Sequence, residues 1–362
     1  TPLTIVGDGV MQVPDSFKKL VRVVANDPSL LLYTVDLIPD KANFLPVNED
    51  TYRQSMFLDN RVAVKDPQWV VAPLWQTIEH VNKDLAAQQC TFIFHVGHCG
   101  STICTRLLES FPNQLALREP LPLRALAAAR RDLGQAGSYV DPGKYAELRK
   151  FIYGMISRRF TSTQNVVVKA TSDVCNVAGE LLDMHKDNRA LLMFLPLENF
   201  LTVMLRNAAR REETAHFAAT RIRDLLENDV EISPLYKLND AERAALSWLS
   251  NMFWLTGLAN QRAQLIDFEA LLQNPATELS SICKFLDVQH DDGRVQSVVN
   301  GPVLSAYSKD PKSPYNPASR QAELAEARRQ FDTEIRAAMN WAADICSRNS
   351  RIEYLSEFFS GN

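Results

Sequence analysis

The sequence predicts an α/β fold with a parallel sheet flanked by helices. From about residue 74 onward, short apolar runs alternate with stretches of helical periodicity, which is typical of strands joined by crossover helices. Four apolar runs predict core strands. The first begins at Phe92, and the others are Val166–Val168, Ala190–Leu195 and Gln264–Phe268. Hydrophobic residues make up 46% of the 362 positions, which is enough to bury a large core.

Residues 1–75 are expected to form an irregular N-terminal appendage. Candidate strands at Leu30–Leu37 and Ser55–Val64 are separated by prolines and by the polar triplet at positions 48–50. This segment falls outside the alternating pattern of the rest of the chain. We therefore expect it either to pack on the core or to cap a substrate site.

The main domain is expected to span residues 76–348. Helical periodicity begins near Leu74 and runs to Leu85, directly before the first core strand. At the other end, residues 318–347 show a long helical pattern whose apolar positions would pack back onto the core. Residues 349–362 then form a polar and aromatic C-terminal tail.

The first core strand breaks into a loop that is suited to binding an anion. The loop reads Gly97-His98-Cys99-Gly100-Ser101-Thr102, and an amphipathic helix follows it. The first turn of a helix exposes unpaired N–H groups with partial positive charge, and glycines let an anion approach them closely. Ser101 and Thr102 add hydroxyl donors. The alternative is a tight strand-to-helix turn without a ligand, and the lysine of a nucleotide-hydrolase loop is missing after Gly100.

Composition excludes several classes of function. The net charge of −4 argues against nonspecific nucleic-acid binding, which needs a basic surface. The six cysteines show neither C-x-x-C nor Cys/His metal spacing, so we expect reduced thiols and no metal site. No apolar run approaches the roughly 18 residues of a membrane span, and the first residues lack the pattern of a signal peptide. These features favour a cytoplasmic protein.

Three segments, in the expected order, resemble the sulfotransferase family. The loop at 98–102 is similar to its 5′-phosphosulfate loop, and residues 191–206 are similar to the strand and helix that hold the donor's 3′-phosphate. Residues 264–286 are similar to a later strand, turn and helix. The resemblance covers roughly residues 90–345 and is nearest in spacing to the protein-tyrosine and bacterial sulfotransferases. It implies a three-layer, P-loop NTPase-like domain with 3′-phosphoadenosine 5′-phosphosulfate as co-substrate and no metal.

The resemblance also implies catalytic residues. Glu119 lies nineteen residues past Gly100, as the catalytic glutamate of protein-tyrosine sulfotransferases does, and would be the general base. The alternative is an N-capping acid ahead of Pro120. His98 replaces the family's Lys or Arg, so it would stabilise the leaving phosphate as an imidazolium or donate one hydrogen bond when neutral. Lys169 would supply a fixed charge, or simply extend to water from a strand end.

The donor's 3′-phosphate is expected at Thr202 and Arg206, which lie one helical turn apart. Phe194 replaces the Arg that the family places at the preceding strand end, and this substitution puts the usual donor in doubt. Arg210 and Arg211 could supply the missing charge or form a solvated helix face.

Ser308 and Lys309 lie in a segment that resembles the late loop of the family, which closes over the nucleotide. Their hydroxyl and ammonium donors are further candidates for nucleotide contact. The alternative is an ordinary polar loop.

The sequence therefore predicts a sulfotransferase that transfers a sulfuryl group by in-line displacement to a hydroxyl or amine of a small-molecule or peptide acceptor. A noncatalytic relative that binds a nucleotide or a partner stays open because of His98 and Phe194. A P-loop kinase is disfavoured by the missing lysine. Neither the acceptor nor the oligomeric state can be read from the sequence.

Overall fold

The computed structural model describes residues 15–307, 310–314 and 317–360. Its centre is a five-stranded parallel sheet in the order β5-β6-β4-β7-β8. The strands are β4 (Cys90–His95), β5 (Gln114–Arg118), β6 (Asn165–Lys169), β7 (Arg189–Phe194) and β8 (Ala263–Asp267). Runs such as Val166–Val168 are buried, as expected for strands covered on both faces. The predicted parallel α/β sheet is confirmed.

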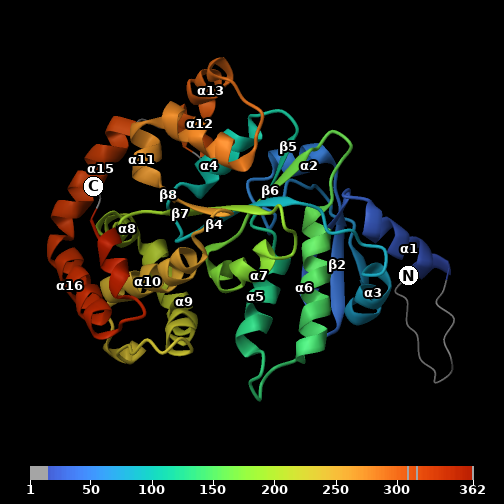
Figure 1. Ribbon diagram of the computed structural model, residues 1–362, viewed down its shortest axis with the longest axis horizontal. Helices are drawn as coiled ribbons and strands as arrows, with labels where there is room; N and C mark the ends of the chain where they lie inside the picture. The colour runs from blue at the N-terminus through green and yellow to red at the C-terminus, as the bar shows by residue number, and fades with distance from the viewer. Residues whose placement is uncertain (1–14, 308–309, 315–316, 361–362) are drawn as a thin grey trace.

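Helices cover both faces of the sheet, so the molecule has the three layers that were predicted (Figure 1). On one face lie α4 (Ser101–Glu109), α11 (Phe268–Gln273) and α12 (Pro275–Leu286). On the other lie α5 (Pro122–Asp132), α6 (Pro142–Ser157), α7 (Ala178–Leu182) and α10 (Asp240–Leu258).

The main domain contains further helices and two short strands outside these layers. They are η1 (Ser172–Val177), α8 (Leu197–Leu205), α9 (Ala208–Leu226), η2 (Leu235–Lys237), α13 (Asp292–Val299), α14 (Pro302–Ser305), β9 (Ala306–Tyr307), β10 (Asp310–Pro314), α15 (Pro317–Gln330), α16 (Asp332–Arg348) and η3 (Glu353–Phe358). The long helix expected at 318–347 is thus two helices, because the chain leaves helical geometry at Phe331, where φ is −111° and ψ is 21°. The tail packs on the core, since Phe359 is buried beside the Trp248 ring.

The N-terminal segment is more regular than expected. It contains α1 (Asp15–Asn26), β1 (Leu30–Asp36), β2 (Lys41–Pro46), α2 (Glu49–Gln54), β3 (Val70–Pro73) and α3 (Leu74–Val81), and its strands form an antiparallel sheet in the order β1-β2-β3. The candidate strand at Leu30–Leu37 is confirmed. The candidate strand at Ser55–Val64 is wrong, because that stretch folds into turns tied by side chains. The Ser55 hydroxyl accepts from the Ala63 N–H at 3.0 Å, for example.

A buried arginine, Arg158, fastens the N-terminal segment to the main domain. The Arg158 guanidinium donates to the carbonyls of Val24, Asp27 and Leu30 at 2.6–2.7 Å. Burial lowers the pKa of Arg158 to about 10, so the group stays charged at neutral pH. Apolar residues of the segment belong to the same buried cluster as the central sheet. The N-terminal segment therefore shares its core with the sheet.

Arg158→Met is expected to lower the free energy of unfolding by at least about 3 kcal/mol. The substitution leaves three carbonyls of the N-terminal segment without their donor, and each unsatisfied buried group costs roughly 1–3 kcal/mol. Urea unfolding measures the loss. Arg336→Met is the control, because its side chain is 75% exposed and its pair with Asp332 is a surface one, so it should cost less than about 1 kcal/mol. Equal losses in the two variants would contradict the anchoring role.

All six cysteines are buried and unpaired. No helix in the part of the chain that the structure describes is long and apolar enough to cross a lipid bilayer.

Candidate functional site

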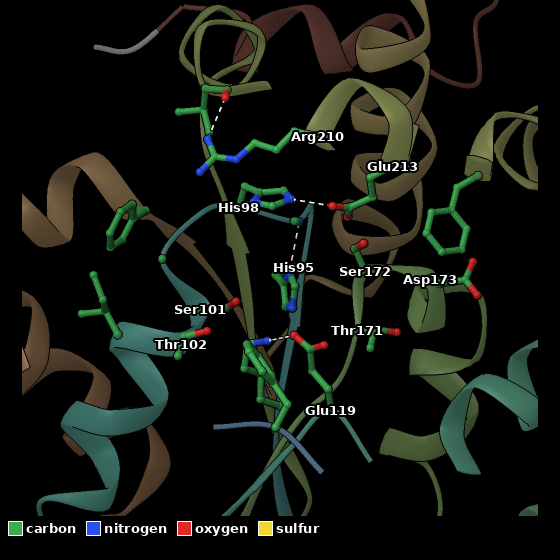
Figure 2. A pocket seen from close by; sticks show the side chains of 18 of the residues that line it. His95, His98, Ser101, Thr102, Glu119, Thr171, Ser172, Asp173, Arg210 and Glu213 are labelled. Carbon is green, nitrogen blue, oxygen red and sulfur yellow. Dashed lines mark hydrogen bonds and ion pairs between the residues drawn. The ribbon is translucent and has the colours of Figure 1, made fainter. Parts of the chain in front are cut away.

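A cavity of about 570 Å³ lies at the carboxyl ends of the central strands. Its lining comes from the loop after β4, from the ends of β5 and β6, from α9 and from α15 (Figure 2). Ligands of open α/β sheets bind at this edge, because the loops that follow parallel strands meet there. This position makes the cavity the candidate active site.

The loop after β4 has the backbone of an anion-binding turn. Gly97, His98 and Gly100 all have positive φ, of 91°, 49° and 74°. The turn ends directly at α4, and the hydroxyls of Ser101 and Thr102 line the cavity (Figure 2). The N–H groups of the first turn of α4 therefore open toward the cavity, where they can bind an anion.

Cys99 differs from the other loop residues that we predicted to bind the donor. Its side chain is fully buried away from the cavity lining, and its thiol lies 3.4 Å from the Met193 carbonyl. Burial raises the pKa of this thiol to about 12. Only the backbone of Cys99 can contribute to the site.

His95, the last residue of β4, holds the loop in place. Its Nδ1 accepts a hydrogen bond from the Gly97 N–H at 3.0 Å, and its Nε2 lies 2.8 Å from the Ala170 carbonyl. These two bonds assign the ring proton to Nε2 of a neutral imidazole. Because both ring nitrogens bond to the backbone, His95 orients the loop and is not suited to act as a base.

Gly100 is required for a close contact as well as for its positive φ. A Cβ at this position would lie 2.0–2.3 Å from three atoms of the Phe268 ring. The Phe268 ring is buried, and the Arg320 guanidinium lies 5.6 Å from its centre. The loop and α11 can approach this closely only without a side chain at position 100.

Gly100→Ala is expected to destabilise the protein by more than the roughly 1 kcal/mol that a positive φ costs an L residue. Gly134→Ala is a matched control, because Gly134 has a φ of 82° and nothing within 4 Å of its added Cβ. The excess loss in Gly100→Ala measures the contact with Phe268. Urea unfolding of both variants gives the comparison, and equal losses would show that the contact can relax.

Glu119 and Lys169 form an ion pair at the ends of β5 and β6. The Glu119 N–H also donates to the Lys169 carbonyl at 2.7 Å. Glu119 has a φ of 58°, a backbone conformation that is rare for residues other than glycine and is concentrated at functional sites. The N-cap alternative for Glu119 is wrong, because α5 begins at Pro122 and its N-cap is Leu121.

Lys169 pairs with Glu119 and lines the same cavity as the loop after β4. Its side chain is only 2% exposed, and its Nζ lies 5.3 Å from the centre of the Phe57 ring. Its positive charge also reaches the loop, where it partly opposes the effect of burial on the Cys99 thiol. The Lys169 side chain is therefore buried and paired with Glu119, and it does not extend to water as the alternative supposed.

His98 pairs with a residue that we did not predict. Its Nε2 lies 2.8 Å from a carboxylate oxygen of Glu213 in α9 (Figure 2). Glu213 belongs to the charged run that also contains Arg210 and Arg211. Arg210 lines the cavity and Arg211 does not. Arg210 is therefore not part of a purely solvated helix face, and the Arg211 guanidinium donates to the Leu205 carbonyl.

The structure brings only part of the predicted 3′-phosphate site to the cavity. Arg206 lines it and pairs with Glu323 of α15 at 2.9 Å. Thr202 is buried outside the lining, and its hydroxyl donates to the Glu198 carbonyl at 2.8 Å, so Thr202 and Arg206 do not converge on one anion. Phe194 packs against the Phe358 ring at 5.4 Å and belongs to the core.

Ser308 and Lys309 lie outside the described residues. Their predicted contact with the nucleotide stays a prediction.

Two residues of the N-terminal segment, Phe57 and Arg61, line the cavity, although the sequence did not predict them as site residues. Arg124 of α5 and Asp173 of η1 also line the cavity. No local pattern around these four residues signals a site, since only the fold brings them together. Phe57 and Arg61 thus put part of the N-terminal segment in the wall of the cavity. Among the described residues, no group of three or more His, Cys, Asp or Glu side chains could hold a metal ion.

No protein-family model and no curated protein matches the sequence. The chain aligns with solved structures that are described as sulfotransferases. The sulfotransferase domain of the Synechococcus PCC 7002 olefin synthase shares 15% identity over 68% of this chain and 94% of its own, with a TM-score of 0.35. The sulfotransferase from Alicyclobacillus acidocaldarius shares 16% identity over 75% and 97%, with a TM-score of 0.35. Mouse sulfotransferase SULT7A1, complexed with PAP, shares 12% identity over 74% and 93%, with a TM-score of 0.33. Scores this low do not establish the activity of this chain.

Proposed function

We propose that the protein is a sulfotransferase that uses 3′-phosphoadenosine 5′-phosphosulfate as its donor. One observation carries this proposal: the Glu119–Lys169 ion pair and the anion-binding turn before α4 line the same cavity. Sulfuryl transfer needs a base for the acceptor, a cation near the leaving phosphate and a rigid anion site. These elements supply all three within one cavity.

The donor set fits two anionic groups. The N–H groups at the start of α4, with the Ser101 and Thr102 hydroxyls, would bind the 5′-phosphosulfate. Arg206 and Arg210 would bind the 3′-phosphate from the other wall of the cavity. Arg206 would exchange Glu323 for the phosphate, and Glu323 is 61% exposed, so its carboxylate can turn to water. These two arginines would take the role of the Arg that Phe194 replaces.

Each catalytic group has a defined part in the transfer. The acceptor atom forms a bond to sulfur while the bond between sulfur and the bridging oxygen of the 5′-phosphate breaks. Glu119 takes the acceptor proton. Lys169 and His98 stabilise the charge that develops on the leaving phosphate, and Glu213 orients His98. The products are the sulfated acceptor and adenosine 3′,5′-bisphosphate.

A transfer assay tests the proposal. The protein is incubated with ³⁵S-labelled donor and a panel of phenols, sterols, sugars and amines, and the sulfated products and the bisphosphate are quantified. We expect labelled product and bisphosphate in equal amounts. Turnover of ATP with Mg²⁺, without any use of the labelled donor, would contradict the proposal and favour a kinase.

A further inference from the structure

Two arginines from distant parts of the chain line the cavity beside Glu119. Arg61 belongs to the N-terminal turns, and Arg124 lies in the first turn of α5. Asp59 pairs with Arg61 and lies close enough to Arg124 to interact with its charge. The Arg61 Nε–H donates to both carboxylate oxygens of Asp59, at 2.9 and 3.1 Å. The positive charge of Arg124 also helps to lower the pKa of Asp59. Burial alone would raise the pKa of Asp59, but the bonds from Arg61 outweigh it and lower the pKa.

The arginine pair keeps one positive charge that no carboxylate balances. The Asp59 carboxylate forms an ion pair with Arg61 and interacts with Arg124 only through its charge, and Glu119 is already paired with Lys169. In the described ranges, no Asp or Glu forms an ion pair with Arg124, although its side chain lines the cavity. A cation of this kind is positioned to pair with an anion supplied by a ligand.

The pair lines the same cavity as Glu119, where the proposed function puts the acceptor. Arg61 and Glu119, the proposed base, both line this cavity, and the charge of Glu119 contributes to raising the pKa of Arg61. The nucleotide groups are assigned to the start of α4 and to Arg206 and Arg210, on other elements. Arg61 is also held in a fixed orientation, because its guanidinium stacks 3.8 Å from the centre of the buried Phe57 ring.

We infer that the acceptor carries an anionic group near its nucleophilic hydroxyl or amine, and that Arg61 and Arg124 bind this group. A carboxylate or a sulfate suits the planar guanidinium donors, which form paired, charge-assisted hydrogen bonds with such anions. Binding of the anion would place the nucleophile against Glu119. The inference rests on the proposed function, because it concerns the acceptor half of the same cavity.

The test compares ligands that differ only in charge. The protein is first saturated with adenosine 3′,5′-bisphosphate. It is then titrated with pairs of ligands, each pair a hydroxy acid and its methyl ester. The pairs cover phenolic, aliphatic and sugar frameworks, and sulfated and unsulfated sugars are added. We expect at least one acid or sulfate to bind about tenfold or more tightly than its neutral partner. Arg124→Gln should weaken the charged ligand by about 10- to 100-fold and bring its affinity close to that of the neutral one.

Arg130→Gln is the matched control, because Arg130 lies on the same helix, does not line the cavity and pairs with Glu180. It should preserve the preference for the charged ligand. Equal binding of charged and neutral partners across the panel, or an equal loss for both in Arg124→Gln, would overturn the inference while the bisphosphate still binds. Failure of the bisphosphate itself to bind would instead contradict the proposed function.

Discussion

Glu119→Gln is expected to fold, to bind adenosine 3′,5′-bisphosphate with near-normal affinity and to lose at least about a hundredfold in turnover. A general base contributes roughly 10²–10⁴ in rate, and glutamine keeps the size of the side chain but cannot take the acceptor proton. The amide oxygen can still accept a hydrogen bond from the Lys169 ammonium, so the ends of β5 and β6 should stay in place. Steady-state kinetics on the best acceptor of the transfer assay gives the measurement.

Glu227→Gln serves as the control for this substitution, because Glu227 pairs with Arg223 on the surface of the main domain and does not line the cavity. It should keep full turnover. If Glu119→Gln also kept near-full turnover, Glu119 would not be the base, and its positive φ would have no catalytic meaning. His95 is a poor replacement, since both of its ring nitrogens bond to the backbone.

Lys169→Met is expected to lower turnover by about 10²–10³-fold. This is the usual effect of removing one preorganised charge stabiliser from a site shielded from water. Methionine keeps an unbranched, apolar stem in the buried position beside the Phe57 ring, so the lost charge is the main change. Because removal of the cation also leaves Glu119 unpaired, the unfolding free energy is measured alongside the kinetics.

The double variant Glu119→Gln with Lys169→Met separates a joint role from two independent ones. If the pair acts as a unit in the transition state, the double variant should be little slower than the slower single variant. Lys150→Met, an exposed lysine on α6, is the control for loss of a lysine and should keep full turnover. An Lys169→Met enzyme with unchanged turnover would show that the buried ammonium serves folding alone.

The sequence was sufficient to predict the features that local patterns determine. Alternating apolar runs and helical periodicity predicted four of the core strands, and the glycines around His98 predicted the turn before α4. The strand β5 was missed because it is short and polar at both ends. That omission also explains why Glu119 could be interpreted as a helix cap, since it follows β5 and precedes the N-cap Leu121.

Side chains that meet only through the fold could not be predicted. His98 and Glu213 are 115 residues apart in sequence, and nothing near Glu213 distinguishes it from the other charges of α9. Arg61 lines the cavity on turns that are tied to the end of β5, where the Leu58 N–H donates to the Arg118 carbonyl at 2.8 Å and the Arg118 guanidinium donates to the Ser55 carbonyl at 2.7 Å. Thr202 shows the converse error. The family resemblance and helical spacing placed it at the 3′-phosphate with Arg206, but its hydroxyl donates to the Glu198 carbonyl within α8.

A calorimetric titration with adenosine 3′,5′-bisphosphate tests the central claim most directly, because it examines donor binding without knowledge of the acceptor. We expect one molecule to bind per chain in the absence of Mg²⁺, and about 10- to 100-fold more tightly than adenosine 5′-monophosphate, through the 3′-phosphate contacts of Arg206 and Arg210. Arg206→Ala should remove most of this discrimination. No binding of the bisphosphate, or binding only of ATP with Mg²⁺, would contradict the account.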